Sequence, residues 1–244
     1  MPEPLATRVA WPAPGHVRAA FTGRAGGVSV GEFSSLNLAD HVGDTAESVA
    51  ENRARLRRAL DLPGEPVWLR QVHGTAVTVV GEDEPAEADA SVCFERNRVL
   101  AILTADCLPL LFTDRAGTVV GAAHAGWRGL AAGVIEAVVL RMRRDPSDLL
   151  AWLGPAIGPA AFEVGGEVRQ ALLDADPGAE AAFQPNARGR WQADLFGLAG
   201  RRLAALGVAA VSGGGLCTHA DATRFFSHRR DGRTGRIASL IWMD

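Results

Sequence analysis

The sequence contains no lysine, and this absence removes one kind of chemistry. All 25 basic residues of the 244-residue chain are arginine, so a mechanism that forms a Schiff base through a lysine amine is excluded. The basic residues are dispersed and the formal net charge is −3, so the basic surface expected of a nucleic-acid-binding protein is missing. We therefore expect a small-molecule partner and no nucleic acid.

Long apolar runs are also lacking. No stretch approaches the ~18 uninterrupted apolar residues of a membrane-spanning helix. Residues 1–11 show neither a basic start nor an apolar segment, which disfavours a secretory signal. With 48% hydrophobic and 22% charged residues, the composition is that of an average globular protein. The sequence thus predicts a soluble, cytoplasmic protein that does not interact with a membrane.

Cysteine and histidine are scarce. The cysteines are Cys93, Cys107 and Cys217, and so small and odd a set does not suit a disulfide framework. Each must therefore be a core residue, a ligand or a nucleophile. Six histidines disfavour a multicopper oxidase, because several copper centres need many imidazole ligands.

Hydrophobic periodicity predicts helices and strands that do not alternate regularly. Helices are expected at residues 45–60, from 127 or 128 to 143, at 167–173 and at 194–206. Strands are expected at 67–72, 75–80, 99–104, 108–113, 118–123, 149–153, 209–211 and 237–242. The acidic stretch 81–87 carries a proline and indicates a surface loop. This order favours an α+β fold with mixed β-sheets over a doubly wound fold, in a single domain that spans residues 1–244.

An arginine interrupts the apolar face of the first predicted helix. Asp44 and Glu47 form a capping-box pattern at its start. Arg53 lies between Val49 and Leu56 on the apolar stripe. Because a guanidinium on a buried face needs an anionic partner or an open cleft, we predict that Arg53 faces a cleft and binds an anion.

Three potential metal ligands lie at or between predicted strand ends: His73, Cys107 and His124. Catalytic zinc sites commonly use three protein ligands and leave the fourth position to water or substrate. The three residues are too far apart in the chain for a local zinc-finger motif, so their placement at strand ends must bring them together. The alternative, a small buried cysteine and two hydrogen-bonded histidines, remains open at this point.

The residues around the three ligands form distinctive motifs. They are Gln71-Val72-His73-Gly74, Thr104-Ala105-Asp106-Cys107 and His124-Ala125-Gly126-Trp127-Arg128-Gly129. Further motifs are Ser35-Leu36-Asn37-Leu38, Asn52-Arg53, Ala88-Asp89-Ala90, Gly154-Pro155-Ala156-Ile157-Gly158, Phe162-Glu163-Val164-Gly165, Cys217-Thr218 and Phe225-Phe226-Ser227-His228-Arg229-Arg230. Through these motifs, most of the chain resembles the bacterial laccase-domain (YfiH-like) purine nucleoside phosphorylases, formerly called polyphenol oxidase laccases.

The resemblance implies a fold, a metal and an activity. It implies a laccase-domain fold in which His73, Cys107 and His124 are catalytic residues and bind one Zn²⁺, with copper less favoured. It also implies an enzyme that cleaves adenosine, inosine or methylthioadenosine with phosphate to the free base and ribose 1-phosphate, and that deaminates adenosine. The sequence leaves open whether the protein is a monomer or a homodimer.

Five further residues are candidates for binding the nucleoside or phosphate. Arg53 and Arg229 offer forked donors that suit phosphate oxygens. Ser227 offers a hydroxyl, and the amides of Asn37 and Gln71 suit the sugar or base, although structural roles remain open for both amides. Three carboxylates remain open as the general acid or base: Asp89, Asp106 and Glu163.

Other functions use the same three central residues. In an amide hydrolase that edits UDP-MurNAc-amino-acid precursors of peptidoglycan, Cys107 would be the nucleophile and His73 or His124 the base. A binding protein would keep the metal as a structural clip, although closed structural sites generally supply four protein ligands. A copper-dependent polyphenol oxidase is a further alternative.

Overall fold

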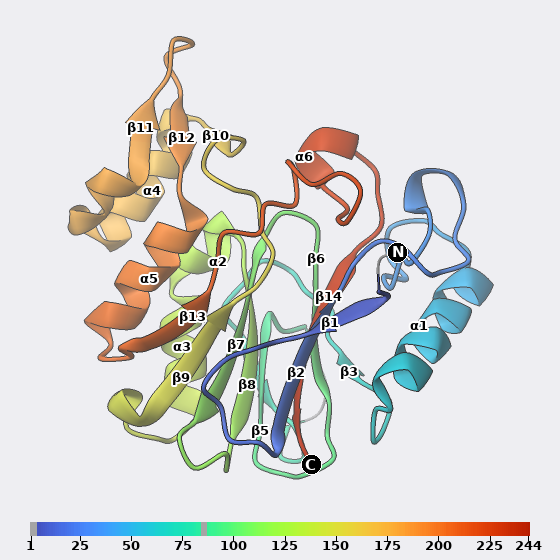
Figure 1. Cartoon of the computed structure of the whole chain (residues 1–244). Coiled ribbons are helices and arrows are strands. Elements are labelled where there is room, and N and C mark those ends of the chain that lie inside the picture. Colours follow the sequence, from blue (N-terminus) through green and yellow to red (C-terminus); the bar gives the residue numbers. More distant parts are fainter. Residues whose placement is uncertain (1–3, 84–86) are drawn as a thin grey trace.

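The fold places two large β-sheets face to face between layers of helices (Figure 1). The computed structural model describes residues 4–83 and 87–244. Within these residues, one sheet has five strands in the order β1-β2-β14-β6-β3, and the other has six in the order β13-β9-β7-β8-β5-β4. A small sheet, β10-β12-β11, lies beyond the end of the six-stranded sheet in Figure 1. Both large sheets contain parallel and antiparallel pairs, which confirms the predicted α+β fold with mixed sheets.

The strands are β1 (Ala6–Arg8), β2 (Val17–Thr22), β3 (Val67–Trp68), β4 (Val77–Val79), β5 (Ala90–Cys93), β6 (Leu100–Thr104), β7 (Leu108–Asp114), β8 (Val120–Ala125), β9 (Leu149–Leu153), β10 (Glu163–Val164), β11 (Phe183–Pro185), β12 (Trp191–Ala193), β13 (Ala210–Gly213) and β14 (Ile237–Met243). The helices are α1 (Ala46–Leu60), α2 (Trp127–Ala132), α3 (Val134–Arg141), α4 (Gly166–Ala175), α5 (Leu195–Ala205) and α6 (His228–Asp231). Short 3₁₀ helices are η1 (Gly31–Phe33), η2 (Pro146–Asp148) and η3 (Pro177–Ala182).

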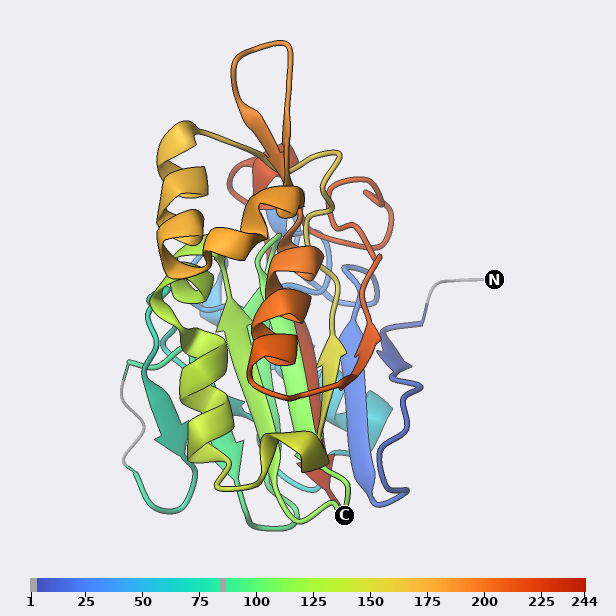
Figure 2. The same cartoon turned by 90° about the vertical axis from the view of Figure 1, so that its left-hand side faces the viewer.

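The strands at the centre are buried on both faces. In β6, Leu100 and Ile102 pack into the core between the sheets, whereas Ala101 and Leu103 pack into the core beneath α1. Helices α2, α3 and α5 cover the outer face of the six-stranded sheet, as Figure 2 shows from that side, and α4 packs on α2 beyond the end of the sheet. Because both faces are covered, these strands are continuous apolar runs without polar alternation.

The first helix matches its prediction except at its cap. Val49, Leu56 and Leu60 are buried, as the stripe predicted. The N-cap, however, is Thr45, whose hydroxyl accepts a hydrogen bond from the Ser48 N–H at 3.2 Å. The predicted capping box at Asp44 was therefore wrong by one residue.

The helix predicted from residue 127 or 128 to 143 is two helices. Gly133 ends α2 in a left-handed conformation, with φ of 95°, and α3 starts at the next residue. Glycine adopts this conformation without the steric penalty of a Cβ atom. The spacing of apolar residues continues across the break, so periodicity alone did not reveal it.

Several short strands differ from the prediction. The predicted strands 67–72 and 75–80 shrink to β3 and β4, and β1, β2, β5 and β10 to β12 were not predicted. Of the predicted loop 81–87, residues 84–86 lie outside the described residues. Within the described chain, no helix is long and apolar enough to cross a membrane.

Candidate metal centre

Three segments that are far apart in the chain meet at one end of the paired sheets. His73 lies in the bend between β3 and β4, Cys107 lies in the crossover from β6 to β7, and His124 lies in β8. Their ligand atoms all lie within 4.8 Å of one another. Since β6 and β7 belong to different sheets, Cys107 is placed where the chain passes from one sheet to the other.

A buried carboxylate fixes two of these side chains. Asp89, fully buried before β5, accepts hydrogen bonds from the backbone N–H groups of His73 at 2.9 Å and Gly74 at 2.6 Å. It also contacts His124 Nδ1 at 2.8 Å. Burial raises the pKa of Asp89, but hydrogen bonds from His124 and Gly74 outweigh this effect and lower it. With Nδ1 committed to Asp89, His124 offers its Nε2 atom as a ligand.

The thiol and the buried imidazole carry opposite charges in the metal-free chain. Burial raises the pKa of Cys107, but the charge of His124 and hydrogen bonds to His124 and His73 lower it to about 6. Burial lowers the pKa of His124, but Cys107 and Asp89 raise it to about 9. A thiolate and an imidazolium therefore face each other near neutral pH.

The donor set fits a metal ion. Cys107 Sγ lies 3.9 Å from His73 Nε2. A tetrahedral zinc ion, with bonds of roughly 2.0 to 2.3 Å, would separate such ligand atoms by about 3.5 Å. Small side-chain movements thus suffice for binding, and His73 is exposed to solvent. The three residues could hold a metal ion and leave a coordination position open.

Gly126 allows the ligands to approach one another. A Cβ atom at Gly126 would lie 2.9 Å from Cys107 Sγ and 3.2 Å from His73 Cδ2. Its φ of −70° is accessible to any residue. The close approach of side chains, rather than backbone conformation, therefore accounts for glycine here.

Asp106 is an anchor for the neighbouring loop. Its carboxylate accepts hydrogen bonds from the Thr218 hydroxyl at 2.6 Å, the Ser227 hydroxyl at 3.1 Å and the Arg229 N–H at 2.6 Å. Ser227 is fully buried and caps α6 by accepting from the Arg230 N–H. The predicted substrate-binding hydroxyl of Ser227 therefore points at Asp106 and not at solvent.

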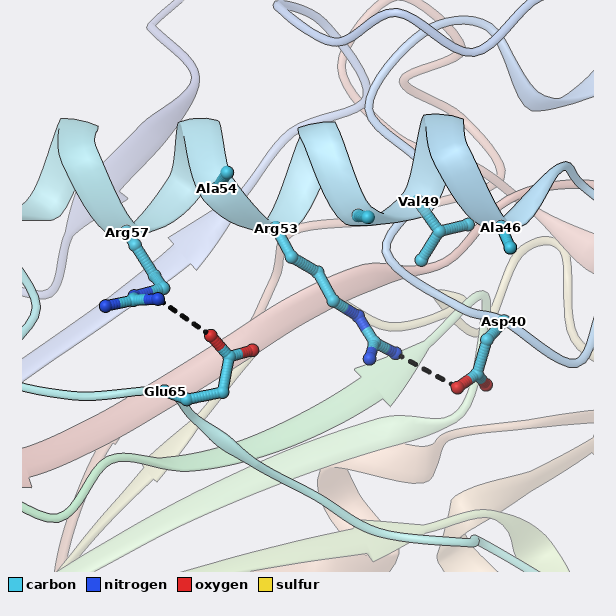
Figure 3. Close-up of a pocket in the computed structure, with 8 residues that line it drawn as sticks. Asp40, Ala46, Val49, Arg53, Ala54, Arg57 and Glu65 are labelled. Carbon is cyan, nitrogen blue, oxygen red and sulfur yellow. Dashed lines mark hydrogen bonds and ion pairs between the residues drawn. The ribbon is translucent and has the colours of Figure 1, made fainter.

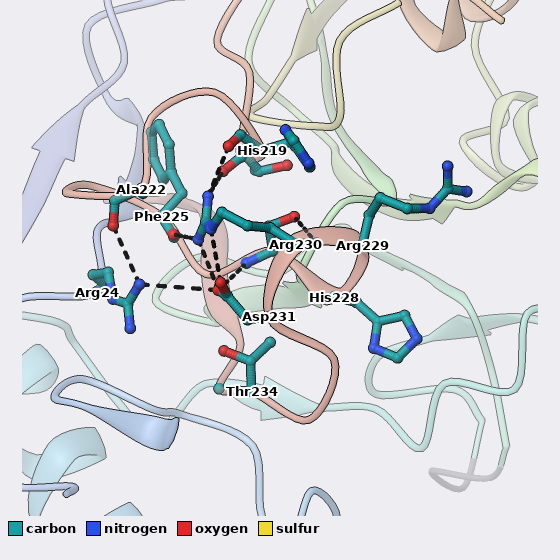
Figure 4. A network of polar contacts seen from close by, with 12 residues as sticks. Arg24, His219, Ala222, Phe225, His228, Arg229, Arg230, Asp231 and Thr234 are labelled. Carbon is teal, nitrogen blue, oxygen red and sulfur yellow. Dashed lines mark hydrogen bonds and ion pairs between the residues drawn. The ribbon is translucent and has the colours of Figure 1, made fainter. Parts of the chain in front are cut away.

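A polar network holds the same loop in place (Figure 4). Arg230 donates to the carbonyl oxygens of Thr218 and His219 at 2.8 and 2.9 Å and pairs with Asp231 at 2.7 Å. Arg24 lies 3.9 Å from Asp231. These contacts fix the chain between β13 and β14 on the side of the centre that carries Asp106.

The side-chain amides of Asn37 and Gln71, predicted to bind substrate, both form hydrogen bonds within the protein. Asn37 is fully buried; its Nδ2 donates to Ala39 O and Asp44 Oδ2, and its Oδ1 accepts from the N–H groups of Ala39 and Arg236. Gln71 pairs with both backbone groups of Leu103, at 2.8 and 2.9 Å. The structure therefore gives the Asn37 amide a structural role, and uses that of Gln71 to hold the segment before His73.

Arg53 lies at a surface groove. It stacks on Trp68 at 4.3 Å, donates to Leu38 O at 3.0 Å and lies 3.5 Å from Asp40. One groove, of about 510 Å³, runs along Arg53 and Trp68 to Gln71 and Val72, next to His73. A neighbouring groove of about 420 Å³ is drawn in Figure 3 and also contains Arg53. Arg53 thus faces a cleft, but it already has an anionic partner.

Arg229 is placed differently from Arg53. Its backbone N–H binds Asp106, and its guanidinium donates to Glu163 O at 2.8 Å and lies 5.5 Å from the Phe162 ring. The residue is exposed. Arg229 is therefore a hydrated cation at the rim of the loop that packs on Asp106.

Comparisons with known proteins give a consistent result. The family model described as "Multi-copper polyphenol oxidoreductase laccase" matches residues 18–244. A purine nucleoside phosphorylase of Pseudomonas aeruginosa is 55% identical over 234 residues, which cover 96% of each chain. Purine nucleoside phosphorylase YfiH of Escherichia coli is 52% identical over 235 residues, again 96% of each chain.

Solved structures agree with the sequence comparisons. The crystal structure of a Neisseria meningitidis protein matches with a TM-score of 0.93 and 46% identity, covering 98% of this chain and 99% of that one. YlmD from Geobacillus stearothermophilus matches with a TM-score of 0.90 and 33% identity, covering 96% of this chain and 94% of that one. Both similarities extend over nearly the whole fold.

Proposed function

This chain is an enzyme that belongs to the multi-copper polyphenol oxidoreductase laccase family, and we propose that it is a zinc-dependent purine nucleoside phosphorylase that also deaminates adenosine. The observation that carries the proposal is the convergence of His73, Cys107 and His124 around an open position, in a chain 55% identical to a curated purine nucleoside phosphorylase. Adenosine, inosine and methylthioadenosine are the proposed substrates.

Zinc is the proposed metal because of the donor set. One thiolate and two imidazoles suit a single three-ligand zinc site. Bound zinc would supply Lewis acidity at the position that these side chains leave open. Asp89 would hold His124 in the tautomer that presents Nε2, as a carboxylate bonded to the far nitrogen of a ligating imidazole does in many zinc sites.

The groove beside His73 is the proposed nucleoside site. Its volume of about 510 Å³ falls within the range usual for small-molecule pockets. Val72, next to the ligand His73, is 47% exposed and offers an apolar surface at the groove, against which a purine ring can pack. Arg53 in the groove and Arg229 at the rim supply positive charge near the substrate.

Phosphorolysis exchanges one bond at the ribose for another. A phosphate oxygen bonds to C1′ while the C1′–N9 bond breaks, and the electron pair leaves with the purine, which takes up a proton. The chain must therefore hold an anion and a nucleoside together, and limit access of water to C1′. Arginine forks suit the anion because they donate two parallel hydrogen bonds to its oxygens.

Product analysis tests this function. Adenosine with phosphate should give adenine and ribose 1-phosphate, whereas adenosine without phosphate should slowly give inosine. Chelation should suppress both reactions, and added zinc should restore them. Failure to form any purine product or ribose phosphate with any metal would refute the proposal.

The acidic thiol favours a second candidate. A thiol with a pKa of about 6 beside two imidazoles is also the arrangement of a cysteine nucleophile with its base. An amide hydrolase acting on peptidoglycan precursors would use it in the metal-free chain. Release of an amino acid from a UDP-MurNAc-amino-acid substrate, retained after chelation, would identify this activity.

A further inference from the structure

A half-buried arginine beside the metal centre has no anionic contact. Arg236 lies in the chain between α6 and β14. Its Nη1 atom donates to the carbonyl oxygens of Thr234 and Gly235, at 2.8 and 3.1 Å. Within residues 4–83 and 87–244, no acceptor bonds its Nε or Nη2 atoms, and no carboxylate forms an ion pair with it. The Nε–Nη2 edge of the guanidinium therefore has no hydrogen-bond acceptor among these residues.

Two negative groups act on Arg236: Cys107 of the metal centre, and Asp106, which anchors the neighbouring loop. Burial lowers the pKa of Arg236, while the charges of Cys107 and Asp106 raise it. The Asp106 carboxylate is already bonded to Thr218, Ser227 and the Arg229 N–H. Ile237 pairs with Thr104 where β14 meets β6, so Arg236 lies at the strand end from which the chain continues to Asp106 and Cys107, and the Asp106 carboxylate is committed elsewhere.

The backbone of Arg236 is held firmly. Its N–H donates to Asn37 Oδ1 at 3.0 Å, and its carbonyl oxygen accepts from the Leu38 N–H at 3.3 Å. Asn37 is fully buried and its amide is saturated. The preceding Gly235 is packed so closely that a Cβ atom would lie 2.7 Å from the Phe226 ring. The guanidinium is therefore preorganised.

Arg236 differs from the other candidate arginines because it is partly buried and has no anionic partner. A partly desolvated charge without a counter-charge is costly, so a half-buried unpaired guanidinium favours an anionic ligand. Arg53 has Asp40 as its partner, and Arg229 is exposed to water. The open Nε–Nη2 edge of Arg236 has the spacing that binds two oxygens of one oxyanion.

We propose that Arg236 binds the phosphate co-substrate through its Nε–Nη2 edge, from a backbone that Asn37 holds in place. The inference rests on the proposed phosphorolysis and deepens it by naming the phosphate site. It also moves the main phosphate contact from Arg53 and Arg229, which the sequence favoured, to a residue that the sequence analysis did not single out.

The test compares phosphate binding in matched arginine variants of the metal-loaded protein. Arg236→Gln should weaken binding of inorganic phosphate, measured by calorimetry, by about tenfold or more, the loss usual for a charge-assisted contact. The KM for phosphate should rise equally, and by more than the KM for adenosine. Arg236→Lys keeps the charge but not the forked pair of donors, so its affinity for phosphate should lie between those of the unsubstituted protein and Arg236→Gln.

Arg233→Gln is the control. Arg233 lies in the same loop, is exposed, and binds the carbonyl oxygens of Val42 and Gly43 and the carboxylate of Glu32, so its loss should leave phosphate binding unchanged. Unaltered phosphate affinity in Arg236→Gln would overturn the proposal; if that variant does not fold, unaltered affinity in Arg236→Lys would do so. Arg236-dependent phosphate binding without any ribose 1-phosphate would refute phosphorolysis but retain the anion site.

Discussion

Asp89 connects two of the three proposed metal ligands through a single carboxylate. It receives the backbone N–H groups around His73 and the imidazole of His124. The backbone of His73 is left-handed, with φ of 63°, a conformation that is unfavourable for histidine. Without the hydrogen bonds to Asp89, this segment would be free to leave that conformation. The geometry of the centre therefore depends on a residue that does not itself reach the metal position.

Gly126→Ala should weaken metal binding although it removes no ligand. The added methyl group would displace the Cys107 sulfur or the His73 ring, because each lies within 3.2 Å of it. We expect the affinity for zinc, measured by competition with a chromogenic chelator, to fall about 10-fold or more, as for other changes next to ligands. The control is Gly200→Ala in α5, where a Cβ atom meets nothing within 4 Å; equal affinities in the two variants would contradict the packing argument.

Metal binding should release protons in a pH-dependent manner. With pKa values of about 6 for Cys107 and about 9 for His124, the metal-free chain at about pH 8 holds a thiolate and an imidazolium. Zinc must displace the His124 proton, so these two groups should together release about one proton per metal. Below about pH 6 the Cys107 proton must leave as well, so affinity falls more steeply as pH decreases.

Calorimetry in buffers of different ionisation enthalpy measures this release directly. Affinity should rise with pH up to about 9 and then level off, because above the His124 pKa no proton remains to be displaced. Zinc binding at pH 8 that releases no proton would contradict the assignment of a thiolate at Cys107 and an imidazolium at His124 in the metal-free chain.

At the scale of elements, crossovers between the sheets create the site. Cys107 lies where β6 of one sheet leads to β7 of the other, while β8 carries His124 from the middle of the six-stranded sheet. The N-terminus of α2 follows His124 directly, after Gly126. A strand and a crossover between sheets thus carry His124 and Cys107, and the bend that carries His73 is held by Asp89.

The sequence predicted elements whose patterns are local. Helix 45–60 and strand 149–153 were predicted almost to the residue, because a 3.6-residue stripe and a bounded apolar run depend only on neighbours in the chain. The break at Gly133 was missed because the apolar spacing continues through it. Short strands such as β3 and β10 are defined by their partners, which periodicity does not contain.

In the site as well, motifs of neighbouring residues could be recognised from the sequence, whereas contacts between distant residues could not. The motifs around His73, Cys107 and His124 pointed to ligands that the structure brings together. The pairing of Asn37 with Arg236 joins residues 199 positions apart, so no local pattern relates them. Ala88-Asp89-Ala90 was a matched motif, but its role as a shared acceptor required the fold.

At the scale of the whole molecule, the apolar residues that stabilise the fold lie apart from the residues of the candidate site. Apolar cores lie between the sheets and beneath each helical layer, while the metal ligands, Asp106 and Arg236 meet at loops and strand ends. The groove that reaches Val72 opens beside this cluster. The proposed nucleoside and phosphate sites thus lie together at one end of the paired sheets.

The most direct test of the account compares two single-cysteine substitutions, Cys107→Ala and Cys217→Ala. Zinc content and ribose 1-phosphate formation from adenosine and phosphate are measured on the same preparations. Cys217 is half-buried and its sulfur accepts from the Gly158 N–H, outside the ligand group. The account predicts that Cys107→Ala loses both zinc and phosphorolysis while Cys217→Ala keeps both; full zinc and full turnover in Cys107→Ala would contradict it.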